Sequence, residues 1–315
     1  MRPLLSFIAL VLLIANTTHA QSGVLPDTVF LHQTREWPSV VNETSGIAHS
    51  SGLVWTFNDS GGKPILYGLS PDNWKIKSRI RLKGQQNIDW ESMAIGNGRV
   101  CIADIGNNKG LRDDLQIFLF SEEVLKAKKC RVIAEHSIRI TYPEQDFPMD
   151  QKGKHDRDAE AITWVGNRLM LFTKNWKTRM TYLVDIDPAA TEVVVQPVDT
   201  LDVGILITGA DYNAEEDLMV LSGYVNYKCY LVLIPHFSDA EKRPANLRKY
   251  YLQGLDNAQT EGVAFYGENG LYLSTEKAKN FTQRGYYLNY QRLVLPTGMR
   301  PEVCLKDAEQ STAKD

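Results

Sequence analysis

A short pattern that recurs five times constrains the fold of this chain more than any other feature of its sequence. Each copy consists of an acidic or hydroxyl residue, a small residue, an apolar residue and a second small residue. The copies begin at Ser45, Glu91, Glu160, Thr208 and Glu261, and they lie 46, 69, 48 and 53 residues apart. A period of about 40 to 50 residues is typical of a four-stranded propeller blade. The pattern therefore predicts five blades.

A second apolar run follows each copy, so each repeat begins as strand, turn and strand. Small residues suit the innermost strand of a blade, because five such strands crowd one axis. The last repeat is one strand short, and residues 28–33 form an apolar strand outside the repeats that could complete it and close the ring. We expect an all-β, five-bladed β-propeller closed by this N-terminal strand. A six-bladed ring with one degenerate blade is the alternative.

The N-terminus has the features of a secretory signal peptide. Met1 and Arg2 precede an apolar run over residues 4–14, and residues 18–20 resemble a small-residue cleavage site. This run is shorter than the roughly 20 apolar residues that a membrane-spanning helix needs. We therefore expect a signal peptide over residues 1–20, one propeller domain over residues 21–315, and a secreted or periplasmic protein that does not span a membrane.

The charge balance argues against a polyanionic partner for the chain as a whole. Its 35 basic and 38 acidic residues give a net charge of −3, which offers no general attraction to nucleic acid or to anionic membranes. We expect a monomer. Of the four cysteines, Cys101 and Cys130 fall within one repeat, so a disulfide between them is the first expectation. Buried free thiols are the alternative.

The five residues that begin the repeats, called the marker residues below, predict a metal site. Carboxylates about 5 Å apart repel one another by about 3 kcal/mol per pair at an effective dielectric constant near 20. A cation among them would remove that repulsion, and oxygen ligands without histidine or cysteine favour Ca²⁺. We predict Ca²⁺ bound by Ser45, Glu91, Glu160, Thr208 and Glu261. Salt bridges with Lys174 and Lys277 are the alternative.

Three residues are candidates for catalysis. Asp59 and Asp104 follow second strands of their repeats, on the propeller face that the marker residues should also reach, and could position or deprotonate a water. Both also lie in sequences that commonly form turns. His155 lies in a long polar loop before Glu160 and could act as a general base, although a solvated loop histidine is the simpler interpretation.

Basic residues near the predicted metal suggest a ligand that carries negative charge. Phosphate or carboxylate groups could bridge a cation and nearby guanidinium or ammonium groups. The candidates for this role are Arg112, Arg157 and Lys174.

Two resemblances accompany these patterns. Ser, Glu, Glu, Thr and Glu at successive marker positions resemble the central calcium site of the five-bladed calcium-activated nucleotidases, the apyrase family. That resemblance implies calcium binding and hydrolysis of diphosphates. Residues 55–61, 89–94 and 104–108 are similar to those of uncharacterised secreted bacterial propeller proteins, which implies the fold and no activity.

Two functions fit these observations. The first is a secreted, calcium-dependent hydrolase acting on a phosphate-bearing or otherwise anionic substrate. The second is a binding protein in which calcium is structural and the loop face captures a small-molecule or glycan ligand. A propeller fold alone does not decide between them, because propellers host both.

Overall fold

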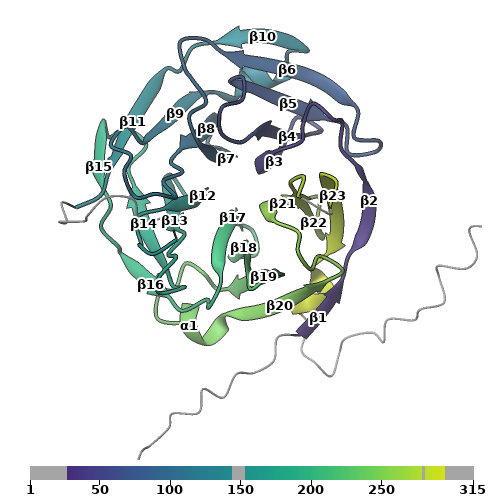
Figure 1. Cartoon of the computed structure of the whole chain (residues 1–315), viewed down its shortest axis with the longest axis vertical. Coiled ribbons are helices and arrows are strands. Elements are labelled where there is room, and N and C mark those ends of the chain that lie inside the picture. The colour runs from purple at the N-terminus through teal and green to yellow at the C-terminus, as the bar shows by residue number, and fades with distance from the viewer. Residues whose placement is uncertain (1–26, 144–152, 279–280, 295–315) are drawn as a thin grey trace, which may run out of the picture.

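The computed structural model describes residues 27–143, 153–278 and 281–294, and these residues form a single ring of five sheets around a central axis (Figure 1). The predicted five-bladed, all-β propeller is confirmed, and the six-bladed alternative is wrong. Residues 1–20, the predicted signal peptide, lie outside the described part of the chain. None of the described helices is long and apolar enough to cross a membrane.

The first two blades share one plan, in which four antiparallel strands are followed at the rim by a fifth, parallel strand. Blade 1 contains β3 (Thr44–Ser50), β4 (Leu53–Asn58), β5 (Ile65–Leu69), β6 (Ile76–Leu82) and, outermost, β10 (Lys129–Val132). Blade 2 contains β7 (Trp90–Gly96), β8 (Arg99–Asp104), β9 (Gln116–Ser121), β11 (His136–Thr141) and β15 (Glu192–Val194). The fifth strand comes from the following repeat in both cases, so neighbouring repeats interlock at the rim.

The remaining blades are built in the same order from the axis outwards. Blade 3 contains β12 (Ala159–Val165), β13 (Arg168–Thr173), β14 (Thr181–Ile186) and β16 (Asp199–Leu201). Blade 4 contains β17 (Leu206–Asn213), β18 (Leu218–Val225), β19 (Lys228–Pro235) and β20 (Arg248–Gln253). Blade 5 contains β21 (Thr260–Tyr266), β22 (Gly270–Thr275) and β23 (Arg284–Asn289). The described residues also include three short helical turns: η1 (Glu122–Lys126), α1 (Arg243–Asn246) and α2 (Gln291–Val294).

The N-terminal segment closes the ring, as predicted, but as two strands rather than one. β1 (Asp27–Phe30) pairs in parallel with β20 at the rim of blade 4. β2 (His32–Glu36) then pairs antiparallel with β23 and completes blade 5. The segment therefore joins the last two blades with backbone hydrogen bonds, and β2 becomes the fourth strand of blade 5.

The cysteines do not form the predicted bridge. Cys101, Cys130 and Cys229 are free, so the prediction of a Cys101–Cys130 disulfide is wrong, while Cys304 lies outside the described residues. The reason is the interlocking of the rim. Cys130 belongs to repeat two in the sequence, but its strand β10 lies on blade 1, whereas Cys101 is packed in the core between blades 2 and 3.

The axis is crowded, as the small residues of the repeats predicted. A Cβ atom added at Gly46 would lie 2.7 Å from the backbone nitrogen of Met93 on the next inner strand. Another at Gly262 would lie 2.8 Å from the backbone nitrogen of Ile47. Real Cβ atoms do not approach backbone so closely, so glycine lets adjacent inner strands come together.

The substitution Gly46→Ala tests this crowding. We expect it to lower the free energy of unfolding by about 3 kcal/mol, because backbone on two blades must separate to admit the methyl group. Gly267→Ala is the control, since Gly267 has a φ of +60° but open space around it. That change should cost about 1 kcal/mol of backbone strain. Urea unfolding of both variants provides the measurement, and equal losses would contradict the crowding.

Candidate functional site

All five inner strands break register at their marker residues. In β7, for example, Trp90 pairs with Asp104 and Ser92 with Ala103, so Glu91 has no partner across the strand. Such a β-bulge re-aims the side chain of the extra residue. The breaks in the five strands contain Ser45, Glu91, Glu160, Thr208 and Glu261. The repeated pattern thus marks a repeated backbone irregularity.

Four of the marker residues line one axial cavity of about 250 Å³: Ser45, Glu91, Glu160 and Glu261. The cavity is completed by residues from the loops and second strands, among them Asp59, Lys174, Trp176, Tyr224, Gln259 and Glu276. Thr208 is not among the lining residues. Its hydroxyl donates a 2.5 Å hydrogen bond to the carbonyl of Thr260 and so ties two inner strands together.

Glu160 is paired with a lysine. The Lys174 ammonium forms an ion pair with Glu160 Oε1, and both side chains are buried, with exposed fractions of 5% and 3%. The same ammonium lies 4.8 Å from the ring centroid of Trp176 and 5.3 Å from that of Tyr224. For this carboxylate the structure has the salt bridge that the sequence left as an alternative. Lys174, predicted to bind a ligand, is already engaged.

A second group of carboxylates forms no ion pair with any residue that the structure describes. Asp59, Asp89 and Glu91 each offer a carboxylate oxygen, and these atoms lie within 4.8 Å of one another. Asp89 was not predicted as a metal ligand. Its position two residues before a marker was the available signal, because alternate residues of an extended segment face the same side. We call these three residues the carboxylate cluster.

The surroundings of the carboxylate cluster suit a hard cation. A Cβ atom at Gly106 would collide with Glu91 Oε1 and Asp89 Oδ2, so only glycine leaves these oxygens room. Burial, and then Asp59, raise the pKa of Asp89 to about 7, while burial and Glu160 raise that of Glu91 well above its usual range. Oxygen donors alone, with no histidine or cysteine, fit Ca²⁺, whose coordination is flexible and completed by carbonyls and waters.

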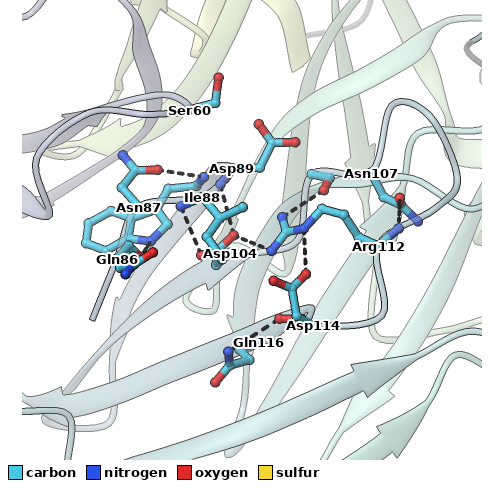
Figure 2. Close-up of polar contacts among 12 residues, drawn as sticks. Ser60, Gln86, Asn87, Ile88, Asp89, Asp104, Asn107, Arg112, Asp114 and Gln116 are labelled. Atoms are coloured by element: carbon cyan, nitrogen blue, oxygen red, sulfur yellow. Dashed lines mark hydrogen bonds and ion pairs between the residues drawn. The ribbon is translucent and has the colours of Figure 1, made fainter. Parts of the chain in front are cut away.

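Asp104 and Arg112 support the carboxylate cluster from outside the cavity. Asp104 accepts hydrogen bonds from the backbone nitrogens of Ile88, at 3.3 Å, and Asp89, at 3.0 Å. Figure 2 shows Arg112 between Asp104 and Asp114, at 2.9 Å from a carboxylate oxygen of each. Neither Asp104 nor Arg112 lines the axial cavity. Their contacts fix the loop that carries Asp89, which is a positioning role rather than the catalytic and ligand-binding roles expected from sequence.

His155 is also engaged in structural contacts. Its Nδ1 accepts a 3.0 Å hydrogen bond from the backbone nitrogen of Arg157, which leaves Nε2 to donate to the carbonyl of Asn108, at 3.0 Å. With both ring nitrogens occupied, the imidazole has no free lone pair to act as a base. Arg157 lies with Arg112 around a separate cavity of about 470 Å³. The structure therefore keeps His155, Arg157 and Arg112 out of the axial cavity.

Two cavity residues that were given no role in the sequence interact directly. Gln259 donates through Nε2 to Glu276 Oε1, at 2.5 Å, and to Glu261 Oε1, at 3.3 Å. Burial, followed by repulsion from Asp59, raises the pKa of Glu276 to about 7. Burial raises the pKa of Glu160 to about 8 although Lys174 beside it acts in the opposite direction. One lysine thus faces more carboxyl groups than its charge can balance.

Comparisons with known proteins assign neither a family nor a function to this chain. No protein family matches the sequence, and no curated protein matches it. The structure is similar to a luciferin-regenerating enzyme, with 10% identity, a TM-score of 0.43, and coverage of 81% of this chain and 95% of that one. The structure is also similar to the calcium-binding protein regucalcin from Agrobacterium tumefaciens str. C58, with 12% identity, a TM-score of 0.47, and coverage of 84% of this chain and 95% of that one. A third similar structure is a glucose dehydrogenase, with 8% identity, a TM-score of 0.46, and coverage of 82% of this chain and 98% of that one.

The raised pKa values predict an unusual pH dependence of stability in the absence of metal. Carboxyl groups that titrate at about 7 to 8 in the folded chain keep protons that the unfolded chain, titrating near its ordinary values, has released. The free energy of unfolding must then fall as pH rises from the ordinary carboxyl pKa of the unfolded chain to the raised pKa of the folded chain. In the presence of a chelator, the melting temperature should be lower at pH 8 than at pH 5.

Calcium should raise the melting temperature strongly at pH 8 and only weakly at pH 5, because protons compete with calcium for the same carboxylate oxygens at low pH. Glu91→Gln should flatten the profile, since the glutamine has no proton to release. Thermal unfolding followed by circular dichroism at both pH values checks these outcomes. A melting temperature that rises with pH in chelator would contradict them.

Proposed function

We propose that this chain is an exported calcium-binding propeller whose ion is held by Asp59, Asp89 and Glu91 at the wall of the axial cavity. The observation that carries the proposal is the convergence of these three carboxylates, none of which is ion-paired with a basic residue in the described part of the chain, whereas Glu160 nearby has Lys174. Bound calcium would supply the positive charge that the carboxylate cluster lacks and would attract oxygen atoms of a ligand in the cavity.

The choice of calcium follows from the donors and from the expected location. Carboxylates are hard ligands, and Mg²⁺ requires a more regular octahedral arrangement than Asp59 and the adjoining Asp89 and Glu91 at the start of β7 readily provide. Calcium is also available outside the cytoplasm, where the predicted signal peptide would deliver the protein. Extracellular calcium modules commonly bind with dissociation constants of about 0.1 to 1 mM.

The axial cavity suits a small, hydroxyl-bearing ligand. It combines the Trp176 and Tyr224 rings with the Gln259 amide and several carboxyl groups. Aromatic faces and hydrogen-bonding groups together are typical of sites for small molecules and the ends of glycans. A ligand rich in phosphate has less support, because Arg112 and Arg157 line a different cavity and Lys174 is paired with Glu160.

A calcium-dependent hydrolase is the second candidate, and Glu276 is the observation that favours it. This residue lines the cavity, and its pKa of about 7 allows it to take up and release a proton near neutral pH. General acid and base catalysts are tuned to this range. Glu276 would replace His155 in that role, since the ring nitrogens of His155 are engaged.

The calcium site is tested by titration calorimetry at pH 7.5. We expect the wild type to bind one calcium ion, and Asp89→Asn and Glu91→Gln to weaken binding at least about tenfold, because each removes a charged oxygen ligand. Glu123→Gln is the control, since Glu123 is exposed and paired with Lys126 on the rim. Unchanged affinity in both site variants would place calcium elsewhere and overturn the proposed site.

The hydrolase candidate is tested by activity with calcium and with chelator, against lactones, aryl esters, phosphomonoesters and nucleoside diphosphates. For any substrate turned over, Glu276→Gln should lower kcat by about a hundredfold while calcium affinity is retained. Glu268→Gln, at an exposed position on the same blade, is the control. If all four substrate classes are inert under both conditions, the binding function stands and the hydrolase is rejected.

A further inference from the structure

A strongly basic face lies far from the axis, on the outer part of blade 1. The strand β6 alternates buried and exposed residues, and the exposed series is Lys77, Arg79, Arg81 and, just beyond the strand, Lys83. The rim strand β10 lies beside it in parallel register, with Lys129 opposite Arg79 and Arg131 opposite Arg81. Figure 1 shows β6 and β10 together at the rim of the ring. We call these six residues the basic face.

The charges of the basic face are not balanced by ion pairs within the described part of the chain. None of its six side chains takes part in an ion pair with a described residue. Like charges on adjacent strands destabilise a sheet. Two such pairs stand side by side here, in a protein whose net charge is −3. An anionic ligand would remove this repulsion.

The basic face continues into a cleft of about 670 Å³. Arg81, Lys83 and Arg131 line its basic side, while Gln85 and Gln86 contribute side-chain amides. No acidic and no aromatic residue is among the lining residues. Gly84, with a φ of +81°, has open space where a side chain would begin, so a ligand can reach the backbone there.

We propose that the basic face and its cleft bind an acidic polysaccharide. Alternate residues on a strand are about 6.6 Å apart, so the row from Lys77 to Lys83 extends over about 20 Å. A row of that length fits a chain with repeated carboxylate or sulfate groups better than a single small anion. The amides of Gln85 and Gln86 and the open backbone at Gly84 provide donors and acceptors for the sugar hydroxyls.

Other polyanions fit less well. Single-stranded nucleic acids are bound by aromatic side chains on which bases stack, and the cleft has none. A bilayer presents a flat charged surface, which cannot enter a concave cleft. A polysaccharide chain can both lie along the basic face and enter the cleft.

The cleft also adjoins the loops of the carboxylate cluster. Asn87 lines the cleft, and its side chain donates to the carbonyls of Asn58, at 2.6 Å, and Asp59, at 3.0 Å. A polysaccharide held there would lie next to the Asp59 loop. Its binding to the basic face requires no calcium, so the two proposals can fail separately.

The test measures binding of polygalacturonate and heparin by titration calorimetry in EDTA, with neutral dextran as the uncharged control. The wild type should bind at least one of the acidic chains, with affinity falling as salt increases, and should not bind dextran. Arg79→Gln/Arg81→Gln/Arg131→Gln should weaken binding at least tenfold. The matched triple Lys109→Gln/Lys177→Gln/Lys228→Gln removes the same charge from exposed lysines on other blades and should change affinity by less than twofold.

Equal losses in the two triple variants, or no binding of either acidic chain by the wild type, would overturn the proposal. Tighter binding of a single-stranded oligonucleotide or of phosphatidylserine vesicles would overturn the choice of polysaccharide. Should the triple variant unfold, the single variant Arg131→Gln on the rim strand decides, with an expected loss of about threefold. A loss under twofold there would count against the basic face.

Discussion

The space around the axis governs this structure, because five inner strands must meet there with almost no room for side chains. Glycines such as Gly46 and Gly262 bring adjacent strands into backbone contact. Larger oxygen-bearing side chains can reach the axis only where a bulge turns them away from the packed sheet. The close contact between inner strands and the gathering of oxygen-bearing side chains at the axis therefore have one origin, the bulge at the start of each inner strand.

Burying several carboxyl groups around one axis creates an electrostatic cost that the chain meets in two ways. Glu160 forms an ion pair with Lys174, whose ammonium also lies over the rings of Trp176 and Tyr224. Asp89 and Glu91 have no ion pair with a basic residue among those that the structure describes, and Gly106 keeps the space beside them open. Removing charge from water is costly unless a partner compensates. A proton at low pH and a cation at higher pH are the two available partners for the second group.

The sequence predicted the ring because its steric requirements recur with the period of a blade. The marker residues could be identified for the same reason, and four of them do line one cavity. The remaining site depends on loop conformation, which has no period. Neither the inward turn of Asp89 nor the engagement of His155 by Asn108 and Arg157 follows from spacing. The rim strands were also hidden, since β10 and β15 leave their own repeats to pair with the preceding blade.

A net charge near zero conceals a radial separation of charge in this protein. Carboxyl groups collect at the axis, while the exposed residues of β6 and β10 collect positive charge at the rim. Whole-chain charge therefore excludes only a general attraction to polyanions. A local one can persist, because fields are screened over about 8 to 10 Å at ordinary ionic strength. Since Asn87 joins the cleft to the Asp59 loop, a ligand at the rim and an ion near the axis would act on the same short stretch of backbone.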